Sequence, residues 1–151
     1  MTWIRQKLAS CGDRIACHEA GKAWSYAEFI KLIDHAATQL PSKGAAVIEV
    51  QAPTTIEGLA MLLAVGETGH IALPLPAELP EAEQDNRRLV ANSSQLYNQL
   101  EGSGLVLFSS GTSGEPKGML HNLDALLGRY KNLSARKDHS LLLLLIDHIG
   151  G

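Results

Sequence analysis

The stretch VLFSSGTSGEPKG, residues 106–118, decides how this chain is interpreted. The apolar segment Val106–Phe108 is typical of a buried strand, and it passes directly into a loop of small and hydroxyl residues. Gly111 and Gly114 allow positive φ and close backbone approach, so successive N–H groups can point at one anion. Further donors come from four hydroxyl side chains and one ammonium group: Ser109, Ser110, Thr112, Ser113 and Lys117. The stretch predicts a phosphate-binding loop, and the alternative is a solvated Ser/Gly linker.

Two common phosphate loops do not match this stretch. A Walker loop that starts at Gly111 requires glycine where Pro116 stands, and a hydroxyl residue where Gly118 stands. The dinucleotide fingerprint fails as well, because Gly102 and Gly104 are followed by Leu107 at the third glycine position. The sequence therefore supports neither a Walker-type nucleotide site nor a Rossmann cofactor site.

Residues 106–117 do resemble, position for position, the phosphate loop of the adenylate-forming (AMP-binding) superfamily. That superfamily includes acyl-CoA synthetases, the adenylation domains of peptide synthetases, and luciferases. Its pattern is an apolar residue, two free positions, two small residues, Gly, Ser or Thr, a small residue, Gly, any residue, Pro and Lys, and every position is satisfied. The resemblance implies a loop that closes on the phosphates of ATP and on the departing pyrophosphate, with these residues as ligands: Ser109, Ser110, Gly111, Thr112, Ser113, Gly114 and Lys117.

Length and composition restrict the class of protein. A chain of 151 residues with 45% hydrophobic residues can bury one ordinary core, which predicts a single domain, residues 1–151. The net charge of −3 and the lack of a basic cluster argue against nucleic-acid binding. The N-terminus has no apolar signal segment, and the apolar run Leu141–Ile146 is too short to span a membrane. Cys11 and Cys17 have no zinc-like spacing, so we expect a cytoplasmic protein without a metal site of its own.

Alternating strand and helix patterns predict an α/β fold, a parallel-type sheet layered with helices. Helices are expected over residues 1–8, 26–39, 54–65, 80–92 and 121–133. Strands are expected over residues 15–18, 45–50, 70–73, 106–108 and 140–146. The helix at 80–92 is interpreted as having a solvated face. The interval between this helix and the phosphate loop is shorter than is usual in the superfamily.

Turn and capping residues set the expected boundaries. Ser25 with Glu28, and Thr54 with Glu57, have capping-box spacing at the starts of two helices. Gly66 and Gly69 are expected to end the second of these helices, and Pro74 to end the strand after it. Either Asn122 or Asp124 is expected to cap the helix at 121–133.

A second candidate site follows the predicted strand at 140–146. Acyl-CoA synthetases typically place His-x-x-Gly after this strand, and His148 to Gly151 has that form. The resemblance implies that His148, Gly150 and Gly151 line the acyl or carboxylate pocket. Asp147 is a weaker candidate, since an aspartate in this region binds the substrate amine in amino-acid-activating relatives.

The reaction that the resemblance implies is carboxylate activation. A small carboxylic acid attacks the α-phosphorus of ATP, with Mg²⁺, to give an acyl-adenylate and pyrophosphate. Coenzyme A or the phosphopantetheine of a carrier protein then accepts the acyl group. The superfamily's magnesium-binding Thr-Glu pair, ribose-binding aspartate and C-terminal lysine are not matched in this sequence.

These missing motifs lead to an expectation about the chain as a whole. We expect an incomplete N-terminal AMP-binding domain without the C-terminal domain, inactive alone, and able to self-associate through an exposed sheet edge. The alternative is a non-catalytic nucleotide-binding or interaction module in which residues 115–118 form an ordinary turn.

Overall fold

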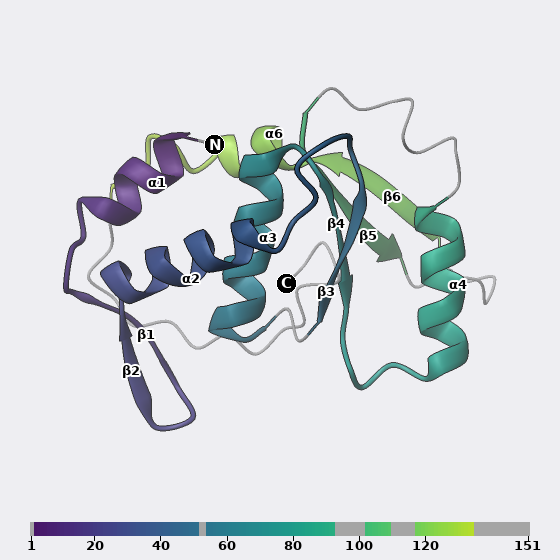
Figure 1. Cartoon of the computed structure of the whole chain (residues 1–151), viewed down its shortest axis with the longest axis horizontal. Coiled ribbons are helices and arrows are strands. Elements are labelled where there is room, and N and C mark those ends of the chain that lie inside the picture. The colour runs from purple at the N-terminus through teal and green to yellow at the C-terminus, as the bar shows by residue number, and fades with distance from the viewer. Residues whose placement is uncertain (1, 52–53, 93–101, 110–116, 135–151) are drawn as a thin grey trace.

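The computed structural model describes residues 2–51, 54–92, 102–109 and 117–134. Within them, helices and strands follow one another along the chain (Figure 1). The helices are α1 (Thr2–Ala9), α2 (Tyr26–Thr38), α3 (Ile56–Thr68), α4 (Glu81–Ala91) and α6 (Leu123–Gly128). The strands are β1 (Ile15–Glu19), β2 (Lys22–Ser25), β3 (Val47–Gln51), β4 (Ile71–Leu75), β5 (Gly104–Ser109) and β6 (Lys117–Asn122).

The main sheet has the strand order β3-β4-β5-β6. β3 pairs with β4, and β4 with β5, in parallel, whereas β6 runs antiparallel to β5. β1 and β2 form a separate antiparallel hairpin. The predicted α/β class with a mostly parallel sheet is confirmed. Every residue of β4 is buried, which is expected of a parallel strand covered on both faces.

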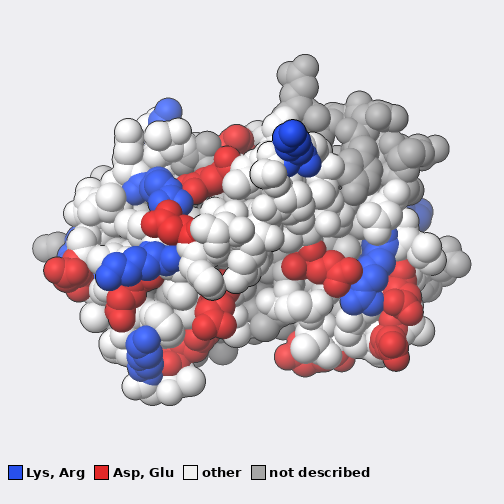
Figure 2. Space-filling model, viewed as in Figure 1, with Lys and Arg blue, Asp and Glu red and all other residues white. Residues whose placement is uncertain are grey.

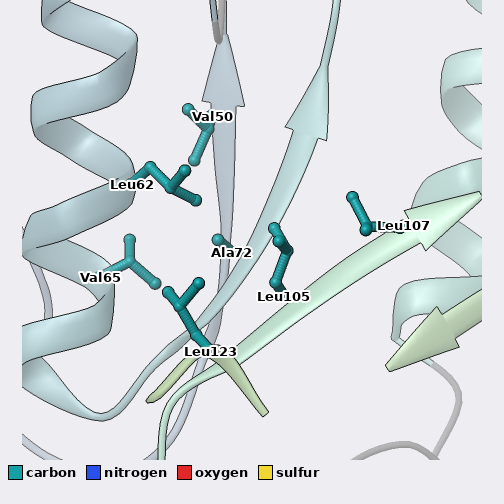
Figure 3. Packing of buried hydrophobic residues seen from close by; sticks show 7 residues of the cluster. All are labelled: Val50, Leu62, Val65, Ala72, Leu105, Leu107 and Leu123. Atoms are coloured by element: carbon teal, nitrogen blue, oxygen red, sulfur yellow. The ribbon is translucent and has the colours of Figure 1, made fainter. Parts of the chain in front are cut away.

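Helices cover the two faces of the sheet, with α3 on one side and α4 on the other (Figure 1). On the first face, Leu62 and Val65 of α3 point at the strands and pack with Val50, Ala72, Leu105, Leu107 and Leu123 (Figure 3). On the second face, Ala91 of α4 packs with Ile71, Leu73, Leu75, Val106 and Phe108. Successive residues of β5 therefore supply opposite faces. Each fully buried leucine or phenylalanine stabilises the fold by about 1.5–3 kcal/mol relative to exposure.

Helix α2 begins at the predicted capping box. Oγ of Ser25 accepts a hydrogen bond from the Glu28 backbone N–H (3.1 Å), and the Ser25 N–H donates to Oε2 of Glu28 (2.8 Å). Phe29, Ile33 and Ala36 then form the buried stripe, which packs against Ile56, Ala60 and Ala64 of α3. This packing places α2 on the outer side of α3, away from the sheet (Figure 1).

The capping box expected at Thr54 and Glu57 is wrong by one residue. Oγ1 of Thr55 accepts from the Gly58 N–H (3.0 Å), and Oε1 of Glu19 accepts from the Ile56 N–H (2.9 Å). A carboxylate from the β1–β2 hairpin thus accepts from the first N–H of α3, beside the local cap at Thr55. Gly69 ends α3 with a φ of 79°, as predicted, while Gly66 is buried inside the helix. The expectation that Gly66 helps to end the helix is therefore wrong, since a helix interior tolerates glycine at a modest cost.

Strand β4 continues through Pro74 instead of stopping at Leu73. Pro74 lies opposite Val50, and Leu75 lies opposite Gln51, in the pairing with β3. The pairing with β5 involves only Ile71 and Ala72. The proline, which lacks an N–H, therefore falls beyond the part of β4 that pairs on both sides.

The helix expected over residues 121–133 is wrong in its first residues and in its length. Residues Lys117–Asn122 form strand β6, and α6 spans only Leu123–Gly128. Leu120 packs in the cluster under α4 while Met119 is 36% exposed, so this segment alternates between faces as a strand does. Of the two expected caps, Asn122 is confirmed, because its Oδ1 accepts from the Ala125 N–H (2.8 Å). The strand expected at 140–146 lies outside the described residues.

On the face of the molecule that Figure 2 shows, acidic and basic side chains are mixed, without a large area of positive or of negative charge. Arg5 of α1 illustrates the mixing, because it donates to Glu67 of α3 (2.7 Å) and to Asp34 of α2 (2.5 Å). Hydrogen bonds to Glu67 are the main cause that raises the pKa of Arg5. No helix in the described part of the chain is long and apolar enough to cross a membrane.

The capping box predicts a pH-dependent stability. Hydrogen bonds from Ser25 lower the pKa of Glu28 below its ordinary value of 4.5, so the carboxylate stabilises the folded state above that value. This contribution is lost as the pH falls through the folded-state pKa. We expect Glu28→Gln to be less stable than the wild type at about pH 7, with the difference shrinking towards about pH 3.

Urea denaturation at a series of pH values measures this difference. Glu57→Gln is the matched control, because Glu57 is also an exposed glutamate in the first turn of a helix but does not form the cap. A difference between Glu28→Gln and the wild type that stays constant with pH would contradict the prediction.

Candidate phosphate-binding site

The β5–β6 hairpin brings the two flanks of the glycine-rich motif together. In the antiparallel ladder Ser109 lies opposite Lys117, and Phe108 lies opposite Gly118. Ser109 ends β5 and Lys117, which is exposed, begins β6. The motif therefore leaves and re-enters the sheet at one place, as expected of a loop built around a single ligand group.

The other predicted site residues lie outside the described residues. They are Ser110, Gly111, Thr112, Ser113 and Gly114 of the loop, and Asp147, His148, Gly150 and Gly151 of the second candidate site. Their roles stay predictions. The structure thus brings together two of the seven predicted phosphate ligands, Ser109 and Lys117.

The hairpin lies at the edge of the sheet where ligands are usually bound in α/β folds. Because β3, β4 and β5 run parallel, the carboxyl ends of all three point to the same edge, which carries Gln51, Leu75 and Ser109. Loops at the carboxyl ends of parallel strands form the binding crevice in open α/β sheets. The position of Ser109 and Lys117 in the fold is consistent with ligand binding.

Helix α4 supports the base of the hairpin through a buried arginine. The side chain of Arg87 is 3% exposed, and its Cζ lies 4.8 Å from the centroid of the Phe108 ring. Nη2 of Arg87 also donates to Oε1 of Glu83 (2.8 Å). A guanidinium group over an aromatic face is an attractive electrostatic contact, and it is stronger when water is excluded.

The contact of Arg87 with the hairpin was not predicted from the sequence. The interpretation of residues 80–92 as a helix with a solvated face gave no reason to expect a buried charge, although the Glu83–Arg87 spacing of four residues predicts an ion pair. The contact with Phe108 joins segments distant in the sequence, and no local pattern encodes it.

Gly118 allows β6 to lie close to α4. A Cβ atom at this position would lie 2.7 Å from Cγ1 of Val90 and 3.2 Å from Cε1 of Phe108. The first distance is shorter than a normal carbon–carbon contact, and valine has little rotamer freedom with which to withdraw. Close packing of α4 against β6 therefore explains the glycine at position 118. The alternative interpretation places a turn over residues 115–118, but Gly118 belongs to strand β6 and not to a turn.

Arg88 connects α4 to β3, the strand at the opposite edge of the sheet from β6. Arg88 donates to both carboxylate oxygens of Glu49 on β3 (2.8 and 3.1 Å) and to Asp85 (2.8 Å). Hydrogen bonds to Glu49 are the main cause that raises the pKa of Arg88. The partners are partly exposed, and such pairs contribute little to stability.

An open hollow of about 510 Å³ lies elsewhere, among α2, α3 and β3. Its lining includes Leu32, His35, Glu49, Thr55 and Met61, and none of the predicted site residues. Among the described residues, no group of three or more His, Cys, Asp or Glu side chains could hold a metal ion.

Comparison with curated proteins finds distant relatives among peptide synthetases, and no family model matches the chain. The chain is 26% identical over 153 residues to CymA of Salinispora arenicola, a probable non-canonical nonribosomal peptide synthetase. That match covers 88% of this chain and 2% of CymA. A match to the nonribosomal peptide synthetase dtxS1 of Metarhizium robertsii is 29% identical over 85 residues, which is 54% of this chain and 1% of dtxS1.

Solved structures with the same fold include a ligase and two N-terminal domains. The o-succinylbenzoate CoA synthetase MenE of Bacillus subtilis, solved with the acyl-adenylate OSB-AMP, gives a TM-score of 0.65 at 17% identity, covering 89% of this chain and 47% of MenE. The N-terminal subdomain of Klebsiella oxytoca NpsA, in complex with 3-hydroxybenzoyl-AMSN, gives 0.62 at 19%, covering 79% and 39%. The N-terminal domain of FACL13 from Mycobacterium tuberculosis gives 0.58 at 17%, covering 80% and 43%.

These comparisons show that the chain has the α/β fold of adenylate-forming enzymes. More particularly, the fold is that of the N-terminal part of such enzymes, as the resemblance of residues 106–117 implied. The chain spans less than half the length of each of these solved structures and 1–2% of the curated relatives.

The packing around Gly118 predicts a specific destabilisation. Gly118→Ala places a methyl group against Val90 and Phe108, so we expect the free energy of unfolding to fall by about 1–3 kcal/mol. Gly128→Ala is the control, because Gly128 ends α6 and, among the described residues, no other part of the chain beyond its neighbours and its own helix lies within 4 Å of the added Cβ. That variant should be neutral or more stable by up to about 1 kcal/mol.

Chemical denaturation followed by circular dichroism measures both variants. Equal stability of the two alanine variants would show that α4 and β6 are not in close contact at Gly118.

Proposed function

We propose that this chain forms the ATP phosphate-binding part of a carboxylate-activating ligase. In this proposal residues 106–118 bind the ATP phosphates, an acyl-adenylate forms with release of pyrophosphate, and coenzyme A or carrier-protein phosphopantetheine accepts the acyl group. The observation that supports it most is the pairing of Ser109 with Lys117 at the carboxyl edge of the sheet. It places both flanks of a complete adenylate-forming motif beside each other in the matching fold.

The donors of the motif suit a phosphate better than a metal ion. Hydroxyl groups, backbone N–H groups and the ammonium group of Lys117 donate hydrogen bonds or positive charge to phosphate oxygens. Glu115 supplies the one carboxylate of the motif, so its residues do not form a magnesium site. Mg²⁺ would therefore arrive with the nucleotide and neutralise part of its charge. Lys117, at the start of β6, would hold the phosphates that become pyrophosphate.

Further parts of the proposal rest on the resemblance. His148, Gly150 and Gly151 would line the pocket for the small carboxylic acid. Residues 1–151 would form one incomplete N-terminal AMP-binding domain of a cytoplasmic ligase, which does not bind nucleic acid. The fold supports this assignment, because the solved neighbours place the same arrangement in their N-terminal parts.

Self-association is also part of the proposal. β3 and β6 are the edge strands of the sheet order within the described residues. An edge strand presents backbone N–H and C=O groups that can pair with a second chain. A homo-oligomer through such an edge would be detected by sedimentation as a concentration-dependent mass.

Nucleotide binding by the chain tests the proposal. We expect isothermal titration calorimetry to detect binding of Mg-ATP and of pyrophosphate by the wild type. Lys117→Ala should weaken ATP binding by about tenfold or more, because a charge-assisted hydrogen bond contributes about 1.5–3 kcal/mol. Lys43→Ala is the control, because Lys43 is an exposed lysine in the loop before β3. It should leave the Kd unchanged.

Turnover is a separate measurement. We expect no ATP–pyrophosphate exchange from this chain alone with any carboxylic acid, since it spans less than half of each solved neighbour. The absence of ATP binding by the folded wild type, or equal losses in the two lysine variants, would overturn the proposal and favour the non-catalytic interaction module.

A further inference from the structure

We infer that Arg87 is a positioning residue for the phosphate-binding hairpin. It holds the Phe108 ring, and so keeps Ser109 and Lys117 in the arrangement that receives the nucleotide. The inference starts from α4, whose neighbouring residues contact three strands: Arg87 contacts Phe108 of β5, Arg88 contacts Glu49 of β3, and Val90 approaches Gly118 of β6. Its consequence for ATP affinity rests on the proposed function.

Arg87 is buried against specific neighbours. Its guanidinium group is 3% exposed and has lost most of its hydration, and its contacts include the ion pair with Glu83 and the ring of Phe108. Replacing a buried ion pair by an apolar side chain of similar volume is often neutral or stabilising. Packing alone would therefore be satisfied by methionine or leucine at this position. What arginine adds is direction, because its rigid planar group stacks on a ring while Glu83 holds one of its N–H groups.

The Phe108 ring is connected to the site by two short paths. Along the chain, Phe108 is bonded directly to Ser109, the last residue of β5. Across the ladder, Phe108 lies opposite Gly118, which follows Lys117. A Cβ at Gly118 would lie 3.2 Å from the ring, so there is little free space between the ring and β6. A change in the tilt of the ring would therefore move both flanks of the loop together.

Arg88 provides a matched control on the same helix. It is an arginine with a side chain 32% exposed, it forms ion pairs with Glu49 and Asp85, and it contacts β3 and not the hairpin. Removing its charge perturbs α4 without touching Phe108. A difference between the two arginine variants therefore reports the hairpin contact and not the general stability of the helix.

The experiment combines amide hydrogen exchange with calorimetry on four variants: Arg87→Met, Arg87→Lys, Arg88→Met and Phe108→Leu. With Arg87→Met we expect exchange in residues 106–109 and 117–120 to become about tenfold faster, because the variant loses a desolvated cation–π contact. The Kd for Mg-ATP should rise about fivefold, a smaller effect because nucleotide binding itself stabilises the arrangement of Ser109 and Lys117. Arg87→Lys should restore at least half of both changes, and Arg88→Met should change neither.

Phe108→Leu keeps an apolar side chain but removes the ring, and it should reproduce the exchange and affinity changes of Arg87→Met. It also serves as the test if Arg87→Met does not fold. Wild-type exchange in folded Phe108→Leu, or equal changes in Arg87→Met and Arg88→Met, would overturn the inference. If the wild type binds no ATP, the proposed function fails, and the exchange measurement alone decides the role of Arg87.

Discussion

The antiparallel pairing of β5 with β6 is the constraint on which the rest of the site depends. In a parallel sheet each strand normally leads into a helix at its carboxyl end, and the chain leaves the sheet there. Here the chain returns at once, and Lys117 comes to lie opposite Ser109. A motif that would otherwise connect a strand to a distant helix is held at both ends by one ladder. The positions of Ser109 and Lys117 then follow from the position of β5, which is fixed by Leu105 and Leu107 on one face and by Val106 and Phe108 on the other.

The two faces of β5 contribute differently to this constraint. The face under α3 packs Leu105 and Leu107 in an apolar cluster with Val50 and Leu62, so it fixes the depth of the strand in the sheet. The face under α4 also carries a buried charge, at Arg87, and a close helix–strand approach, at Gly118. Apolar contacts are not directional, whereas an ion pair stacked on a ring restricts orientation. The apolar face stabilises the hairpin, and the α4 face determines how it is oriented.

The elements with strong local signals could be predicted from the sequence, and those that depend on distant contacts could not. The capping box of α2 depends on residues only three positions apart, Ser25 and Glu28. The left-handed end of α3 depends on a single residue, Gly69. By contrast, the N–H of Ile56 is satisfied by Glu19, 37 positions away, and no local pattern predicts that partner. Residues 117–122 have apolar residues that fit a helix or a strand, and pairing with β5 decides for the strand.

For the candidate site, the sequence predicts the class of ligand, and the structure adds the contacts that support the motif. The residue types and spacing of 106–117 predict phosphate binding, because backbone N–H groups, hydroxyl groups and a lysine can all donate to phosphate oxygens. A fold shared at 17–19% identity adds the location at the carboxyl edge of the sheet, yet the same fold can carry unrelated chemistry. The motif therefore indicates the chemistry, and the fold explains how the two ends of the motif are held. The buried pair formed by Arg87 and Phe108 belongs to this support, because a planar guanidinium group over an aromatic ring restricts the orientation of both groups.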